Sequence, residues 1–395
     1  MQISVTDGIR LDAAASHIRL TKSQQDLTAS VNLFAFKLFN QVRNSRSEES
    51  ILLSPFSASM ALGMASTGAE GETEKQMLSV LGFENTSKEE MAEYYSTMLV
   101  GLAKADPYVN LKIANSIWVD NAFPVKEDFV KNCWESFDAV ALNRDFHSPS
   151  TLKEINDWVS EKTDGTIKDF LDKLDPNSKI ALINALSFEG KWRYAFPESK
   201  KTSFMNASGK KKRTDMMHAI GDLYYGNNSG WELLRLPYGA NAFSMLIILP
   251  PEEEDFKKTI LENSILQSLF TSIRLCNVNM NIPSFISQDS HDLIEPLKAM
   301  GMTAPFGEAC FPGISDEPLT IGTVNQRNSI EVNETGTKAT AATEVQLISY
   351  LNLPDPNQER RKPESINFDA DRPFYYLIIE ESTDTILFIG QLTEP

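Results

Sequence analysis

The stretch FDADRPFYYLIIEESTDTILFIGQL, residues 368–392, decides how the end of this chain folds. It holds two apolar runs, Phe374 to Ile379 and Thr385 to Leu392, each the length of a buried strand and rich in β-branched and aromatic residues. The polar residues from Glu381 to Asp384 separate the runs and are typical of a turn. The pattern therefore predicts two strands joined by a turn.

Working back from this stretch, further apolar runs predict strands in the second half of the chain. They are Leu182 to Phe188 and Ser244 to Leu249, and Pro250-Pro251 stops the second of them. Nothing in their order resembles a series of alternating strands and helices, so a doubly wound sheet is not expected.

Helical patterns dominate the first half of the chain. Val31 to Phe39 carries apolar residues at helical spacing. Ser54-Pro55 reads as an N-cap followed by proline in the first turn, and the helix expected over 56–67 is rich in small residues that favour close packing beneath a sheet. A third pattern, 155–174, is amphipathic and interrupted at Gly165. Helices first and strands later predict the α+β class.

Composition and charge exclude several classes of function. The chain has 395 residues, 42% of them hydrophobic, which is enough for a large core. Its formal net charge of −17 argues against nucleic acid as a partner, because an acidic surface repels phosphates. The basic cluster Lys210 to Arg213 is interpreted as a solvated turn between strands. No apolar run approaches the length of a membrane span.

The cysteines and the beginning of the chain bear on its location. Cys133, Cys276 and Cys310 lack CxxC spacing and are odd in number, which argues against a zinc site and against a disulfide framework. Residues 1–27 are polar and irregular, so we expect an N-terminal extension. They lack the layout of a signal peptide, which leaves a mature secreted form, a trimmed chain and a cytosolic protein open.

No motif points to an enzyme. The sequence contains no HExxH, GxSxG, GxxxxGK[ST] or GxGxxG pattern. His17, His147, His218 and His291 lie far apart among surface-like neighbours, and we interpret each as structural. We therefore predict no catalytic residues, no metal site and no cofactor.

The segment EVNETGTKATAATEVQLISYL, residues 331–351, is a polar stretch that alternates like a strand. From Thr337, every second residue is small or apolar, whereas the intervening set holds Lys338 and Glu344. Gly336 precedes the alternation and can act as a hinge. The stretch that follows is rich in Pro, Asn and charge and should be exposed. The pattern fits a segment with two states, a loop outside a sheet and a strand inside it; an ordinary edge strand with a long following loop is the alternative.

These residues resemble the reactive-loop hinge of the serpins, and the resemblance runs in order from about Val31 to the C-terminus. LLSPFSASMALGMASTGAEGET (52–73) resembles the family's shutter helix, and LINALSFEGKWRYAF (182–196) is similar to its central-sheet motif. The most specific matches are LPYGANAFSMLIILP (236–250) and the opening stretch, 368–392. Further blocks that match are LKIANSIWV (111–119) and INDWVSEKTDGTIKDFL (155–171).

The resemblance implies one domain, residues 28–395, with helices around a large central mixed sheet, two smaller sheets and an exposed reactive loop at about 334–367. It also implies a suicide-type inhibitor whose loop, cleaved by a serine protease, inserts residues 337–349 into the central sheet. The hinge residues that it assigns are Glu334, Gly336, Thr337, Ala339, Ala341, Ala342 and Thr343. The residues that it assigns to the shutter and breach are Ser54, Ser57, Asn184, Trp192 and Gln326.

Counting from Glu334 in the family's usual way places the reactive bond at Tyr350–Leu351. An aromatic residue at this position suits chymotrypsin-like proteases such as chymotrypsin or cathepsin G, and Ile348 or Leu351 would suit proteases of elastase or chymotrypsin type. Two alternatives stay open. The long stretch after Tyr350 contains Arg360 and Arg361, which suit trypsin-like proteases, and some serpins are non-inhibitory carriers or chaperones.

Two residues depart from the family's pattern. Gln326 stands where the family usually has the shutter histidine, which predicts that the pH response of a histidine is lost there. Ser284 stands where the family often has lysine, so no charge partner for Glu334 is expected. The extension and the few cysteines resemble bacterial extracytoplasmic serpins. We therefore expect a monomeric secreted or cell-surface protein, with a cytoplasmic one as the alternative.

Overall fold

The computed structural model describes residues 13–337 and 363–395. Its longer helices are α1 (Lys22–Arg43), α2 (Pro55–Ser66), α3 (Gly71–Leu81), α4 (Lys88–Leu102), α5 (Glu127–Phe137), α6 (Pro149–Lys162), α7 (Asn263–Thr271) and α8 (Ile294–Ala299). Its strands are β1 (Ile51–Leu53), β2 (Val109–Asp120), β3 (Val140–Arg144), β4 (Ile180–Lys191), β5 (Glu198–Met205), β6 (Lys211–Asn228), β7 (Trp231–Pro237), β8 (Phe243–Leu249), β9 (Arg274–Pro283), β10 (Phe285–Asp292), β11 (Ile321–Asn333), β12 (Gly336–Thr337), β13 (Glu364–Asp369), β14 (Phe374–Glu380) and β15 (Thr385–Leu392).

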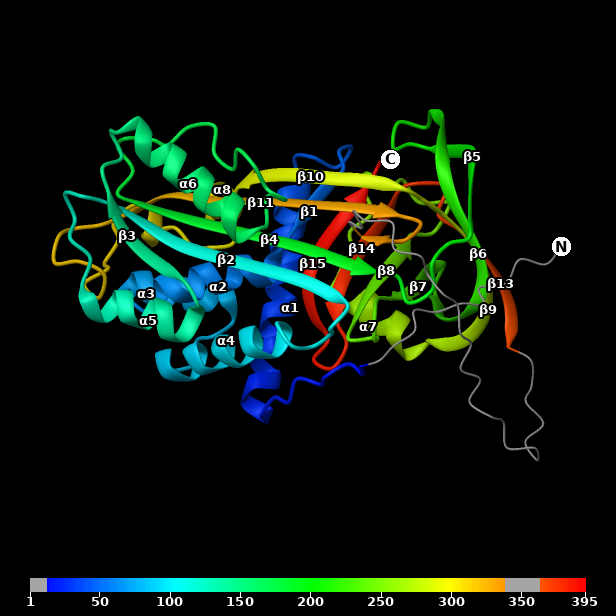
Figure 1. The fold of residues 1–395 in the computed structure, drawn as a ribbon, viewed down its shortest axis with the longest axis horizontal. Coiled ribbons are helices and arrows are strands. Elements are labelled where there is room, and N and C mark those ends of the chain that lie inside the picture. Colours follow the sequence, from blue (N-terminus) through cyan, green and yellow to red (C-terminus); the bar gives the residue numbers. More distant parts are fainter. Residues whose placement is uncertain (1–12, 338–362) are drawn as a thin grey trace.

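The central sheet runs along the long axis of the molecule (Figure 1). Its strand order is β10-β11-β12-β4-β2-β3. The central strands β11 and β4 are parallel and pair directly from Ile321–Ile180 to Ser329–Ser187. At one end of the sheet, the two residues of β12 lie between them and pair antiparallel with both. The sheet is therefore mixed, and a short piece of a further strand already lies in its middle.

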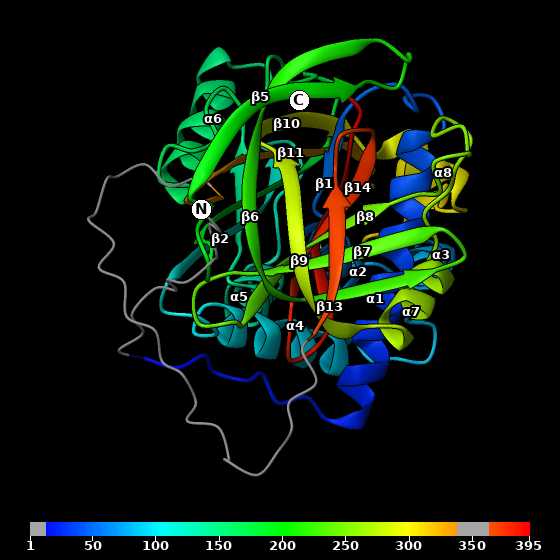
Figure 2. The same ribbon diagram turned by 90° about the vertical axis from the view of Figure 1, so that its right-hand side faces the viewer.

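The remaining strands form one continuous sheet, and its strands β6, β9 and β13 lie side by side at the front of Figure 2. The order is β1-β15-β14-β8-β7-β6-β9-β13, with β5 paired to β6. Two smaller sheets were expected, but the structure joins them into one. The long strand β6 makes the connection, because its 18 residues pair with β5 and β9 along one part and with β7 along another. The expected α+β class and serpin-like architecture are confirmed.

Each face of the central sheet is covered by helices. Alternate residues of β4 point to opposite faces, so Leu182 belongs to the main core and Ala181 to a smaller one. The smaller core is formed with α6, whose Ile155 and Val159 are fully buried. On the other face lies α2, and every one of its residues is buried, as its small side chains predicted (Figure 1).

Several local predictions are confirmed. The two strands of residues 368–392 form the β14–β15 hairpin. The helix after Ser54 begins at Pro55, although the Ser54 hydroxyl caps no backbone group. The cluster from Lys210 to Arg213 lies exposed at the β5–β6 connection. All three cysteines are free.

Two local predictions were wrong in part. The helix expected over 155–174 ends at Lys162 and does not resume after Gly165. Instead, the side-chain amide of Asn156 both donates to and accepts from the backbone of Leu171, which fixes the following segment in a non-helical path. The second difference concerns the polar start of the chain, where α1 begins at Lys22 with a capping box from Thr21, inside the extension predicted over 1–27.

The residues before α1 also pack on the body of the protein. The backbone of Ser16 donates to Ala105, and the side chain of Ile18 is buried against Gly101. None of the described helices is long and apolar enough to cross a membrane.

Candidate functional site

Gly336 lies where the chain enters the central sheet, between Asn333 of β11 and Lys191 of β4. A Cβ atom here would collide with the backbone carbonyl of Gly190 and lie 2.7 Å from the Cα of Lys191. Glycine is therefore required by close backbone approach as well as by conformational freedom. Any larger residue would push β12 out of the gap between the two strands.

Thr337 is the last described residue of this segment, and its side chain is fully buried. Its hydroxyl lies 2.6 Å from the hydroxyl of Tyr238. Burial raises the pKa of Tyr238, so its phenol stays protonated at neutral pH and can share a hydrogen bond with Thr337. The first residue of the alternating segment is thus seated inside the sheet.

Aromatic rings hold Tyr238 in place. The ring of Trp192 stacks on it at 4.4 Å between centroids, and Phe188 meets it edge-on at 4.9 Å. The indole N–H of Trp192 donates to the carbonyl of Asn333, and its backbone N–H donates to Thr335. Trp192 therefore links the end of β4 to both sides of the turn that leads into β12. The family resemblance assigns this residue to the breach.

Gln326, which the resemblance assigns to the shutter, lies on β11 at the seam where this strand pairs with β4. It is fully buried. Its side-chain carbonyl accepts from the backbone N–H of Ser54 at 2.8 Å, and its amide donates to the Ser54 carbonyl at 2.7 Å. The same amide donates to Asn184 of β4 at 2.9 Å. One glutamine thus connects β11, β4 and the start of α2.

Asn184 extends this network toward β2 and α2. Its amide donates to the backbone carbonyl of Ser57 at 3.0 Å and also contacts the Ser57 hydroxyl and the side-chain carbonyl of Asn115. The structure therefore brings Ser57, Asn184 and Gln326 together. Ser54 joins through its backbone, because its buried hydroxyl has no partner among the described atoms.

The structure corrects the interpretation of His291, which was expected among surface-like neighbours. This residue is 6% exposed and is paired in register with Gln326 across β10 and β11. Its Nε2 lies 2.9 Å from the carboxylate of Asp289. Burial alone would raise the pKa of Asp289, but the hydrogen bond with His291 and the charge of Arg46 lower it below its ordinary value.

The burial of His291 could have been predicted from the alternating sequence of β10. Phe285, Ser287 and His291 share one phase of the strand and are all buried, whereas Ile286 and Gln288 of the other phase are exposed. A period of two anchored at Phe285 places the histidine on the inner face.

The remaining predicted residues are separated from this network or lie outside the described residues. Glu334 is half-buried beside Trp192, its carbonyl accepts the backbone N–H of Phe196, and it forms no ion pair with any described residue. Ser284 contacts the backbone of Asp215 instead. The predicted residues outside the described part of the chain are Ala339, Ala341, Ala342, Thr343, Tyr350, Leu351, Arg360 and Arg361.

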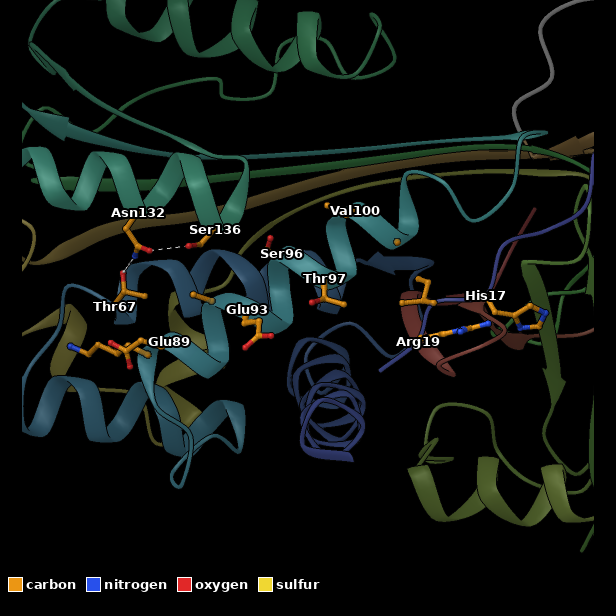
Figure 3. Close-up of a pocket in the computed structure, with 14 residues that line it drawn as sticks. His17, Arg19, Thr67, Glu89, Glu93, Ser96, Thr97, Val100, Asn132 and Ser136 are labelled. Atoms are coloured by element: carbon orange, nitrogen blue, oxygen red, sulfur yellow. Dashed lines mark hydrogen bonds between the residues drawn. The ribbon is translucent and has the colours of Figure 1, made fainter. Parts of the chain in front are cut away.

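A hollow of about 1020 Å³ lies elsewhere, between the N-terminal segment, α4 and α5 (Figure 3). His17 and Arg19 lie at one end of it, and Asn132 and Ser136 of α5 lie at the other. The hydrogen bonds drawn there join Asn132 to Thr67 and to Ser136. None of the predicted hinge or shutter residues lines it.

One group of described side chains has the composition of a cation site. The ligand atoms of Asp120, Asp145 and His147 lie within 4.8 Å of one another. Both oxygens of Asp120 accept backbone N–H groups, from Ala122 and Phe146, and Asp145 accepts the N–H of His147. These hydrogen bonds orient the two carboxylates.

Comparison with known proteins agrees with the fold. A family model described as Serpin (serine protease inhibitor) matches residues 29–395. The chain belongs to the serpin family. Members of this family are generally inhibitors of serine proteases rather than enzymes.

Individual serpins are similar over nearly the whole chain. An uncharacterized serpin-like protein of Methanosarcina mazei is 31% identical over 387 residues, which cover 94% of this chain and 88% of the relative. Human neuroserpin is 30% identical over 378 residues, which cover 91% of this chain and 89% of the relative. The structure of human thyroxine-binding globulin complexed with thyroxine has a TM-score of 0.84 at 24% identity and covers 94% of this chain and 99% of that one. That likeness shows the shared fold.

Proposed function

We propose that this serpin is a suicide-type inhibitor of serine proteases, which traps the acyl-enzyme by inserting its cleaved loop into the central sheet. The observation that carries the proposal is how β11, β12 and β4 are paired. Gly336 and Thr337 already lie between β11 and β4, whereas the two strands below them are paired directly with each other. The sheet holds the first residues of a further strand and can admit the rest only by opening.

The alternation of the sequence fits such a strand. Thr337 faces the interior and is fully buried. With a period of two, the residues of the same phase are Ala339, Ala341, Thr343, Val345 and Leu347. All are small or apolar, so insertion would bury none of the charged side chains of this segment.

Insertion also supplies the energy for trapping. Residues 337–349 would gain ladder hydrogen bonds at about 1 kcal/mol net each, or on the order of 10 kcal/mol in all. The protease is bound to the loop as an acyl-enzyme and would be dragged with it. Distorting its oxyanion hole would slow deacylation by on the order of a hundredfold or more. Inhibition then requires that insertion be faster than hydrolysis of the acyl-enzyme, and small residues at the hinge favour insertion.

We place the reactive bond at Tyr350–Leu351, with chymotrypsin-like targets such as chymotrypsin or cathepsin G, because an aromatic residue fits their apolar pocket. Proteases of elastase type acting near Ile348, and trypsin-like proteases acting at Arg360 or Arg361, are the competing assignments. Cleavage at the arginines would leave a longer arm and a more loosely held protease.

The experiment mixes the protein with chymotrypsin and follows the products on denaturing gels. We expect an SDS-stable complex and a released C-terminal peptide that mass spectrometry finds beginning at Leu351. In parallel, Tyr350→Arg should transfer complex formation from chymotrypsin to trypsin. A loop that is only clipped, with protease activity retained, would overturn inhibition. A peptide beginning at Arg361 or Lys362 would overturn the assignment of the reactive bond alone.

A non-inhibitory carrier or chaperone is the second candidate, since thyroxine-binding globulin shares the fold in a complex with thyroxine. The residues described at the hinge favour inhibition over this candidate, because neither Gly336 nor Thr337 is bulky or charged. We further propose a monomer that acts outside the cytoplasm, where its target proteases would be secreted.

A further inference from the structure

His291 is the buried histidine nearest the shutter, on the strand beside β11. Its Nε2 lies 2.9 Å from a carboxylate oxygen of Asp289 and 3.2 Å from the backbone carbonyl of Leu52 in β1. Its Nδ1 lies 3.2 Å from a guanidinium nitrogen of Arg46. Three separate segments therefore meet at one imidazole ring.

The partners determine which form of the ring fits. Arginine can only donate hydrogen bonds, so the Nδ1 beside Arg46 must accept one. The Nε2 faces two oxygen acceptors, so it must carry the proton. The neutral imidazole with its hydrogen on Nε2 satisfies every contact, whereas the protonated ring would turn a second N–H toward the Arg46 cation.

The charged groups around the ring come from several elements. Arg46 forms an ion pair with Asp289 at 3.1 Å and another with Glu49. A cavity of about 410 Å³ is lined by His291 and Arg46 together with Asp292 and Glu295 from β10 and α8, and α1 contributes only the uncharged Gln41 and Val42. The facing parts of β1 and β11 contribute the uncharged Leu52, Gln326 and Asn328.

This cluster is connected to the seam of the sheet. The carbonyl of Leu52 that faces His291 also accepts a hydrogen bond from Asn328 at 3.3 Å. The same amide of Asn328 donates to Gln326 at 2.9 Å, and Gln326 connects to Asn184 across the seam. The N–H of Leu52 donates to Asp289 at 3.4 Å. A polar chain thus runs from Arg46 through β10 and β1 to the strands that must separate.

We propose that His291 is a positioning residue for opening of the central sheet, and that its protonation loosens the contact of β10 with Arg46, in the segment between α1 and β1, and so speeds loop insertion in mildly acidic solution. The proposal rests on the inhibitory function proposed above. Histidine side chains ordinarily change charge between about pH 5 and 8. Gln326 cannot titrate, and the histidine paired with it across β10 and β11 supplies the pH response that was predicted to be lost.

The test measures sheet opening without a protease. A synthetic peptide of residues 337–349 is added to the intact protein, and its uptake is followed by native gels and mass spectrometry from pH 8 to pH 5.5. We expect the uptake rate to rise toward acid by roughly tenfold, the change that one pKa unit of differential interaction produces. His291→Gln keeps a polar group without a titratable one and should make the rate independent of pH.

Two further variants control the test. His218→Gln changes a half-buried histidine on β6 that contacts Asn281, and it should keep the slope of the wild type. Arg46→Gln removes the cation that opposes protonation and should flatten the slope even if His291→Gln does not fold. The role of His291 would be overturned if the uptake rate of the wild type did not change with pH or fell toward acid. It would also be overturned if His291→Gln or Arg46→Gln showed the same pH dependence as the wild type. Because no protease is present, failure to inhibit chymotrypsin would overturn the proposed function and leave this measurement intact.

Discussion

The hydroxyl groups of Tyr238 and Thr337 lie 2.6 Å apart at the point where β12 enters the central sheet. Tyr238 follows β7 and is held between Trp192 and Phe188, whereas Thr337 begins the segment that is expected to move. The fixed partner is therefore aromatic and rigid, and the mobile partner is small. This hydrogen bond anchors β12 to the residue that follows β7.

Removing the Tyr238 hydroxyl should release the hinge. Tyr238→Phe leaves the buried Thr337 hydroxyl without its partner, which costs about 1 kcal/mol or more. We expect faster amide hydrogen exchange in the peptide spanning Val332 to Thr337, by roughly fivefold on that estimate. Tyr225→Phe, which removes a phenol bonded to Glu232 elsewhere, should leave this peptide unchanged. Equal exchange in the two variants would contradict the assigned role.

A charged residue at position 337 should convert the inhibitor into a substrate. Thr337→Arg would place a guanidinium in a fully buried position, so insertion slows and hydrolysis wins the race. We expect the number of inhibitor molecules consumed per trapped protease to rise at least about tenfold, since tenfold corresponds to only about 1.4 kcal/mol. Thr335→Arg adds the same side chain at an exposed position and should change little. A stable complex formed as efficiently by Thr337→Arg as by wild type would refute the small-residue argument.

Gln326 should matter for stability more than an exposed glutamine does. Gln326→Ala leaves both backbone groups of Ser54 and the carbonyl of Asn184 without this partner, at about 1–3 kcal/mol for each unsatisfied group. We expect the first unfolding transition in urea to lose about 3 kcal/mol or more of free energy. Gln288→Ala removes an exposed glutamine from β10 and should change it by less than about 0.5 kcal/mol. If the two variants lost similar amounts of unfolding free energy, the hydrogen bonds of Gln326 would contribute little to stability.

The sequence alone was sufficient where local pattern decides the structure. The β14–β15 hairpin follows from two apolar runs and a polar turn, and the burial of Thr337 agrees with the alternation that begins there. The sequence was insufficient where a distant side chain decides. Asn156 captures the backbone of Leu171 and ends a helix whose pattern continues. His291 is buried because β1 and Arg46 cover it, and neither is near it in the sequence.

The last prediction concerns the energy stored in the seam. In the described state, β11 and β4 pair directly below Thr337, so the strand that residues 337–349 would form has no place until the sheet opens. Cleavage of Tyr350–Leu351 should let that strand form and add on the order of 10 kcal/mol. For a chain of this size, we expect the melting temperature to rise by about 10 °C or more. Calorimetry before and after limited chymotrypsin digestion measures this shift, and Thr337→Arg digested in the same way should gain much less. An unchanged melting temperature in the cleaved wild type would mean that the loop does not insert.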